Sequence, residues 1–143
     1  MHACQIAHRD LPMQNCLLDV RANVLKVCDL GLSISAHDFV CGRVVTTAPY
    51  RVAEVCLHAP ASLQIPPAAM DLWSAGCIIY ALFGATFLFH IPEIPGPRDS
   101  SREVFSQQVS LLGNPVPMWP DAQKRYCMPG FPSFDRTKEC KSG

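Results

Sequence analysis

The sequence has no excess of charge of either sign, which limits the kinds of partner it can attract. The 143-residue chain carries 12 basic and 12 acidic residues, so its formal net charge is +0 with histidine neutral. A chain balanced in this way has no dominant field to attract bulk nucleic acid or an anionic membrane. We therefore expect neither as a partner.

A long apolar run is also missing. The longest one, Ala75 to Leu82 and on to Phe83, is shorter than the roughly 20 residues of a membrane span and better suits a buried helix. Residues 1–7 contain no apolar core followed by a cleavage site, so they do not predict a secretory signal. There are no repeats, and 11 of the 13 prolines gather in three regions that indicate loops: 60–67, 92–97 and 115–132.

Paired cysteine motifs are missing, although cysteine itself is plentiful. None of the eight cysteines is spaced C-x-x-C, and several lie in apolar runs, as buried free thiols do. This usage indicates a reducing compartment, the cytoplasm or the nucleus. The histidines other than His8 form no ligand pattern, and we expect surface or packing roles for them: His2, His37, His58 and His90.

What the sequence does contain is a polar constellation near its start. Residues 8–15 read His-Arg-Asp-Leu-Pro-Met-Gln-Asn, and Asp29-Leu30-Gly31 follow a short strand pattern. Asp10, Asn15 and Asp29 thus offer two carboxylates and a carboxamide. At this spacing such groups can hold a nucleophile and magnesium beside the terminal phosphate of a nucleotide, which is phosphoryl-transfer chemistry.

The residues between the two parts of this constellation predict a β-hairpin. In residues 16–28, two short apolar runs flank a polar turn at 19–23. A hairpin would bring Asn15 and Asp29 to neighbouring strand ends and so gather the proposed metal ligands. The alternative is an ordinary surface hairpin with unrelated polar residues at its ends.

Two helices are predicted further along the chain. Residues 32–54 are loop-like, whereas residues 71–83 follow a double proline and are apolar on nearly all faces, which predicts a central buried helix. Apolar positions 104, 105, 109, 111 and 112 predict a second, amphipathic helix, and Gly113-Asn114-Pro115 predicts its end.

These segments resemble protein kinases and follow the order of that family. Residues 8–15 resemble the catalytic loop H-R-D-L-x-x-x-N, and residues 29–31 resemble the magnesium-binding D-F-G with Leu in place of Phe. Residues 47–54 are similar to the end of the activation segment in cyclin-dependent kinases, T-x-W-Y-R-A-P-E. Residues 71–76 are similar to the D-x-W-S-x-G helix of the larger kinase lobe.

The resemblance implies a fold, cofactors and a set of site residues. The fold would be α+β, a partial protein kinase-like domain over residues 1–137 that is mainly the α-helical C-terminal lobe with a small β-hairpin, and residues 138–143 would be a tail. ATP and Mg²⁺ would be the cofactors. In the reaction, the resemblance implies that Asp10 orients or deprotonates the substrate hydroxyl and that Thr47 seats the substrate Ser or Thr. Asn15 and Asp29 would hold magnesium, and Leu17 and Gln14 would lie at the nucleotide. Arg9 would await an activating phosphate, and Asp71 would hold the catalytic-loop backbone.

Several positions depart from the family pattern. Pro12 stands where the family has a Lys on the transferred phosphate, and losing one such donor typically costs about a hundred- to a thousandfold in rate. The acceptor of activating phosphorylation falls on Cys41 or Gly42, which have no hydroxyl, and no later Arg suits Glu54 as its buried partner. No Gly-x-Gly-x-x-Gly occurs in the chain, so we predict no measurable kinase activity from these residues alone. Further departures are Met13, Pro49, Val52 and Ala53.

Three hypotheses remain open at this point. The chain is a fragment or truncated gene model of a cyclin-dependent-type serine/threonine kinase, or a non-catalytic pseudokinase module that binds a cyclin-like or substrate protein, or a decayed reading frame without a stable product. Because the family helix that would cover residues 71–83 is reduced to residues 1–7, we also expect an exposed apolar patch. Its expected members are Trp73, Ile78, Ile79 and Leu82.

Overall fold

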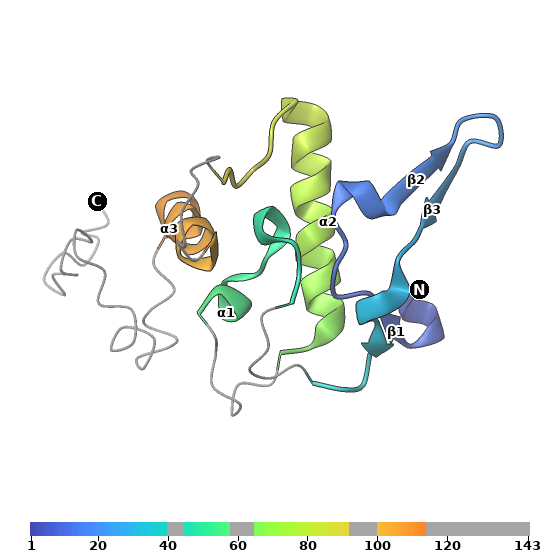
Figure 1. Ribbon diagram of the computed structural model, residues 1–143, viewed down its shortest axis with the longest axis horizontal. Coiled ribbons are helices and arrows are strands. Elements are labelled where there is room, and N and C mark those ends of the chain that lie inside the picture. The colour runs from blue at the N-terminus through green and yellow to red at the C-terminus, as the bar shows by residue number, and fades with distance from the viewer. Residues whose placement is uncertain (40–44, 58–64, 92–99, 114–143) are drawn as a thin grey trace, which may run out of the picture.

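The computed structural model describes residues 1–39, 45–57, 65–91 and 100–113 (Figure 1). Within these ranges lie four short strands, three α-helices and four 3₁₀ turns. The position expected for activating phosphorylation and the tail at 138–143 lie outside the described residues.

Helix α2, Pro67–Gly84, occupies the centre of the described structure (Figure 1). It begins at two prolines, whose fixed φ suits the first helical turn. It ends at Ala85, which has a left-handed φ of 56° and donates its backbone N–H to the Ala81 carbonyl at 2.9 Å. The buried face repeats at helical spacing, and its members include Met70, Asp71, Ser74, Cys77 and Ala81.

Helix α2 is central, as predicted, but only one of its faces is buried. Ile79, Leu82 and Phe83 are 55%, 69% and 91% exposed, whereas Trp73 and Ile78 are half-buried. The expected apolar patch is therefore present, but its centre is the outward face of the last turns. At 18 residues α2 is also long and apolar enough to cross a membrane on length and composition alone, a test that a core helix of a domain can pass as well. The length of the apolar run therefore does not decide whether this helix crosses a membrane or is the core helix of a domain.

The predicted hairpin is confirmed. Strands β2, Cys16–Asp19, and β3, Val24–Val27, pair antiparallel with Cys16 opposite Val27 and Asp19 opposite Val24. The Asp19 carboxylate caps the turn by accepting the Ala22 N–H at 3.0 Å, which is the local hydrogen bond that makes Asp a turn residue. The pattern was readable because both strands and their turn lie within a dozen residues.

A second small sheet was not predicted. Strand β1, Ile6–Ala7, pairs antiparallel with β4, Ile34–Ser35, in a region that the sequence pattern made loop-like. Two-residue strands leave no periodic signal, and this pair forms only because two distant segments meet.

Helix α1, Ala53–Cys56, and helix α3, Ser100–Leu112, complete the described elements. The predicted second helix is confirmed with an earlier start, and Gly113 follows it with φ of 88°. Its buried residues are Ser101, Val104, Phe105 and Gln108. Leu111 and Leu112, two of the five apolar positions that predicted the helix, are exposed.

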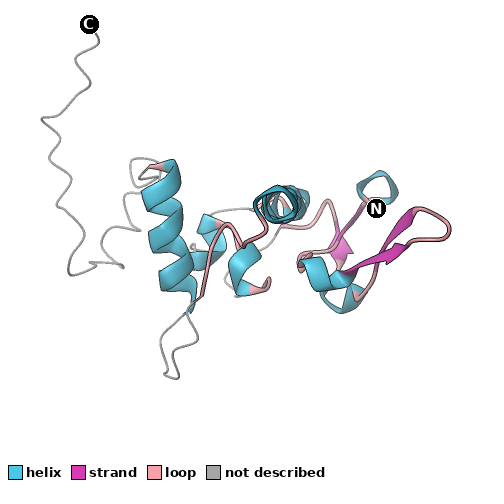
Figure 2. Ribbon diagram, turned by 90° about the horizontal axis from the view of Figure 1, so that it is seen from above, coloured by secondary structure: helices cyan, strands magenta, loops and turns pink. Residues whose placement is uncertain are grey.

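Two apolar clusters form the core, and Trp73 of α2 packs against both. Helix α3 and the β2–β3 hairpin lie on opposite sides of α2 (Figures 1 and 2). The first cluster is Val45, Val52, Val55, Ile65 and Met70; the second is Tyr50, Cys56, Leu57, Cys77, Phe89, Val104 and Phe105.

Candidate active site

The buried carboxylate of Asp71 holds the segment that precedes Asp10. Asp71 is 3% exposed, and its two oxygens each accept a backbone N–H at 2.8 Å, Oδ2 from His8 and Oδ1 from Arg9. His2 Nε2 lies 2.8 Å from Oδ2 as a third partner. Paired buried donors fix a carboxylate and the backbone that it binds. The role expected for Asp71 therefore agrees with the geometry, whereas the part of His2 was missed.

The imidazole of His8 joins this segment to the end of the hairpin. His8 is fully buried, its Nε2 lies 2.9 Å from the Cys28 carbonyl, and its Nδ1 accepts the Asp10 N–H at 3.3 Å. Because one nitrogen faces a carbonyl and the other a donor, the neutral ring with its proton on Nε2 satisfies both contacts. His8 thus fixes Asp10 relative to the residue that precedes Asp29.

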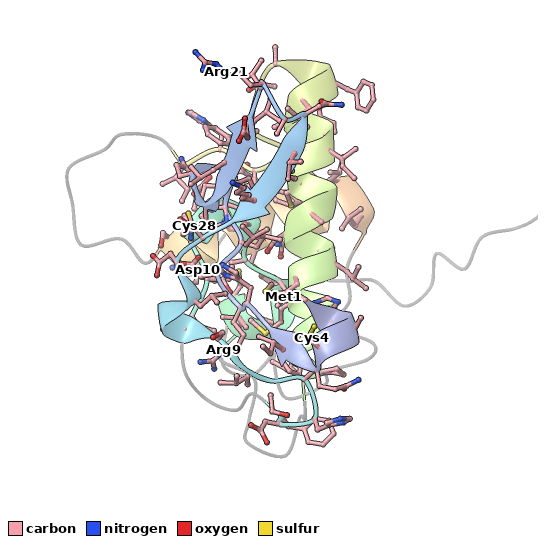
Figure 3. The ribbon with its side chains drawn as sticks, turned by 90° about the vertical axis from the view of Figure 1, so that its right-hand side faces the viewer. Met1, Cys4, Arg9, Asp10, Arg21 and Cys28 are labelled. Atoms are coloured by element: carbon pink, nitrogen blue, oxygen red, sulfur yellow. The ribbon has the colours of Figure 1, made fainter. Side chains whose placement is uncertain are left out.

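The carboxylate of Asp10 is oriented by Thr47. Asp10 Oδ1 accepts two hydrogen bonds from this residue, one from the backbone N–H at 2.7 Å and one from Oγ1 at 2.8 Å. Among the described residues, Oδ2 of Asp10 accepts no hydrogen bond. In Figure 3, Asp10 and Cys28 lie near the base of the hairpin, whose tip carries Arg21.

Asn15 and Asp29 lie at the neighbouring ends of the hairpin, as predicted. The Asn15 carbonyl accepts the Cys28 N–H at 2.9 Å, and Asn15 Nδ2 donates to the Asp10 carbonyl at 3.0 Å. Asp29 has a left-handed φ of 63°, which Asp tolerates better than most residues, and its Oδ1 accepts the Gly31 N–H at 3.3 Å. A Cβ on Gly31 would lie 3.2 Å from that oxygen, a tight approach that would require the Asp29 side chain to shift slightly.

These side chains suit magnesium better than a metal that needs a full protein cage. The described residues contain no group of three or more His, Cys, Asp or Glu that could hold a metal. Mg²⁺ is commonly held by one or two protein oxygens, with phosphate and water completing its shell. The Asn15 amide oxygen and the Asp29 carboxylate are hard ligands of this kind.

The remaining candidate residues have distinct surroundings. Leu17 is 53% exposed on β2, Gln14 is exposed in the 3₁₀ turn Met13–Asn15, and Pro12 before that turn is buried. Arg9 has φ of 67°, and its Nε donates to the Leu32 carbonyl at 2.6 Å. Glu54 is half-buried and makes no ion pair with any described residue.

The sequence did not predict a buried hydrogen-bond network behind Thr47. Arg51 is 8% exposed and donates from Nη1 to Ser101 Oγ at 2.6 Å, and from Nη2 and Nε to the Thr46 carbonyl at 2.9 and 3.2 Å. Gln108 Nε2 in turn donates to the Arg51 carbonyl at 2.7 Å. The sequence offered one signal, a charged residue between the apolar Tyr50 and Val52, but nothing that pointed to its partners on α3.

Burial also alters two cysteines near these elements. Burial, and to a lesser extent the neighbouring Cys28, raises the pKa of the Cys16 thiol. Burial in α2 raises the pKa of Cys77 from 9.0 to about 11. Both thiols therefore stay protonated and unreactive at neutral pH.

Comparison with known proteins agrees with this geometry. The family model described as the protein kinase domain matches residues 1–123. The chain belongs to the protein kinase family, and its partial α+β fold of helices with a small hairpin is kinase-like, as predicted.

Proteins that are similar to this chain include a cyclin-dependent kinase, a mitogen-activated protein kinase homolog and a serine/threonine-protein kinase. Cyclin-dependent kinase C-1 of Arabidopsis thaliana is 34% identical over 98% of this chain and 26% of its own length. The mitogen-activated protein kinase homolog NTF6 of Nicotiana tabacum is 37% identical over 80% of this chain and 28% of its own, and the serine/threonine-protein kinase prp4 of Schizosaccharomyces pombe is 34% identical over 60% and 17%.

A solved structure, the yeast RNA Pol II CTD kinase CTDK-1 complex, shares the fold with a TM-score of 0.65 and 28% identity. It covers 90% of this chain and 38% of the matched one. The chain therefore spans well under two thirds of the length of these relatives.

Proposed function

We propose that the chain carries the catalytic loop of a serine/threonine protein kinase of the cyclin-dependent type, which transfers phosphate from ATP to a protein hydroxyl. The observation that carries the proposal is the carboxylate of Asp71, whose two oxygens bind the backbone N–H groups of His8 and Arg9 at 2.8 Å. This support holds the candidate base, Asp10, in a fixed place before substrate arrives.

The two carboxylate oxygens of Asp10 would have different roles. Thr47 occupies Oδ1 with two donors, and this fixes the plane of the carboxylate. Oδ2 is then left to accept the hydroxyl hydrogen of a substrate Ser or Thr, which orients that oxygen for attack. In this arrangement Thr47 limits the approach of the substrate by forming the wall beside Asp10.

ATP and magnesium fit the other side of the site. Asn15 and Asp29 would hold Mg²⁺, and a bound Mg²⁺ supplies neutralisation of the charge on the phosphate oxygens. Leu17 and Gln14 would contact the nucleotide. Arg9 would be placed for an activating phosphate, although Cys41 and Gly42 at the expected acceptor position have no hydroxyl to carry one. The 143-residue chain by itself has Pro12 in place of a charged donor and no glycine-rich loop, so we propose that it is inactive when isolated.

The first experiment concerns the gene and its longest product. The coding sequence upstream of Met1 is read for a glycine-rich loop and a strand Lys, and the longest frame is expressed. We expect that product to transfer radiolabelled phosphate to a Ser/Thr protein substrate, and Asp10→Asn to lower the rate about a thousandfold. Asp19→Asn, which makes the same change from acid to amide in the hairpin turn, is the matched control and should leave the rate unchanged. A frame without these upstream elements, or a product without transfer, would refute the proposal.

A second function is favoured by two observations, the buried Pro12 and the exposed apolar side chains of α2. In this alternative the chain binds a cyclin-like or substrate protein without phosphorylating it. MgATP should then leave the melting temperature unchanged while the protein partner raises it, since a ligand at a hundred times its Kd stabilises by about 2.7 kcal/mol. A clear shift with MgATP would count against this alternative.

We also propose a cellular location for the protein and bounds for its domain. The five cysteines that the structure describes as free thiols support a reducing compartment, the cytoplasm or the nucleus. Residues 1–137 are proposed as one partial domain. Limited proteolysis of the expressed chain would expose the third hypothesis, a decayed reading frame, as rapid cleavage throughout.

A further inference from the structure

We propose that helix α3 positions the carboxylate of Asp10 through one clamped peptide, the peptide unit between Thr46 and Thr47. The proposal depends on the proposed function only in treating Asp10 as the catalytic group. The clamp itself follows from contacts that are independent of any nucleotide.

Helix α3 holds Arg51 by hydrogen bonds with two of its side chains. Ser101 Oγ lies 2.6 Å from Arg51 Nη1, and Gln108 Nε2 lies 2.7 Å from the Arg51 carbonyl. Ser101 and Gln108 are two helical turns apart and therefore share one face of α3, and both are buried. Side chain and main chain of Arg51 are thus both tied to the same helix.

The clamped peptide transmits this position. In a trans peptide the carbonyl and the following N–H lie in one plane and point in opposite directions. The Thr46 carbonyl accepts Arg51 Nη2 at 2.9 Å and Nε at 3.2 Å, while the Thr47 N–H donates to Asp10 Oδ1 at 2.7 Å. Fixing the oxygen toward Arg51 therefore directs the N–H toward Asp10.

Thr46 would not hold this conformation by itself. Its φ of 79° is rare for a β-branched residue, whose side chain crowds the backbone in the left-handed region. The described contacts that hold it are the two from Arg51 and the bond from Thr46 Oγ1 to the Arg9 carbonyl at 2.7 Å. If Arg51 moves, Thr46 can return to a negative φ, and the rotated peptide takes the Thr47 N–H away from Asp10.

Gln108 offers a clean test of this chain of contacts. Its Oε1 is buried and has no hydrogen-bond partner among the described residues. Burying this oxygen costs free energy, so an apolar side chain of the same length should be tolerated at this position. Gln108→Met keeps the length and removes the donor, and we expect it to fold. The matched control is Gln107→Met on the same helix. Gln107 ties α3 to the backbone of His90 at 2.8 and 2.5 Å and does not hydrogen-bond Arg51.

The experiment measures amide hydrogen exchange by NMR on the full chain without nucleotide, in wild type, Gln108→Met, Ser101→Ala and Gln107→Met. We expect the Thr47 amide to exchange at least about tenfold faster in the first two variants than in wild type, with the amides of α2 unchanged. Gln107→Met should leave the Thr47 amide at its wild-type rate. Ser101→Ala, a smaller change, keeps the test valid if Gln108→Met does not fold.

Unchanged exchange at Thr47 in both α3 variants, or equal acceleration in Gln107→Met, would overturn the proposal. In an active longer product the same variants should lower kcat about tenfold and leave the KM for ATP unchanged, because the nucleotide side of the site is not touched. The exchange result stands without catalysis, so absence of phosphoryl transfer in every variant would refute the proposed function alone.

Discussion

At the scale of single residues, one buried carboxylate does most to organise the site. Asp71 lies on the central helix, yet its partners His2, His8 and Arg9 are more than 60 positions away in the sequence. A buried carboxylate is costly unless its oxygens are satisfied, and here three donors satisfy them. This residue therefore couples the stability of α2 to the geometry of the loop that carries Asp10.

Replacing Asp71 by Asn tests this coupling. The amide keeps one acceptor but presents an NH₂ group to the second backbone donor, so we expect a loss of about 3 kcal/mol in the free energy of unfolding. Urea unfolding followed by circular dichroism measures this loss. The control Asp19→Asn, in an exposed turn, should cost less than about 0.5 kcal/mol. A loss below about 1 kcal/mol for Asp71→Asn would show that the loop does not depend on this carboxylate.

At the scale of elements, α2 has two faces with opposite environments. Met70 is 1% exposed on the inner face, while Phe83 is 91% exposed at the end of the outer face. Composition could not distinguish them, because the helix is apolar nearly all round and the hydrophobic pattern has no strong direction. Only the packing of the other elements decides which side is covered.

Two substitutions on α2 should therefore differ sharply. We expect Phe83→Lys to change the free energy of unfolding by less than about 0.5 kcal/mol and to reduce self-association of the chain. Met70→Ala should cost about 2–5 kcal/mol, because it removes buried volume from a core cluster. Denaturant unfolding and analytical ultracentrifugation give the two readings. Equal costs at the two positions would contradict the assignment of the faces.

At the scale of the whole molecule, stability at high pH should depend on the core that contains Cys77. The pKa of this thiol is raised from 9.0 to about 11 in the folded protein. The unfolded chain therefore loses the proton first, so the contribution of the buried thiol is complete below pH 9 and is lost as pH rises toward 11.

We predict that the free energy of unfolding falls between pH 9 and 11 and that Cys77→Ala makes this fall less steep. Thermal melts at several pH values measure the slope. Cys4→Ala, at an exposed cysteine, is the control and should keep the wild-type slope. An unchanged slope in Cys77→Ala would show that this thiol does not contribute.

The sequence alone determined the features that depend on neighbouring residues. The hairpin, the central helix, the end of the second helix and the kinase family could all be predicted, because turn residues, apolar spacing and motifs lie within short windows. The central helix was predicted at 71–83 and begins four residues earlier, at Pro67. Only the tertiary structure decided the rest: the pairing of β1 with β4, the exposed face of α2, and the contacts of Arg51 with Ser101 and Gln108. Those contacts join residues 50 or more positions apart, and their energies arise only once the chain has brought the residues together.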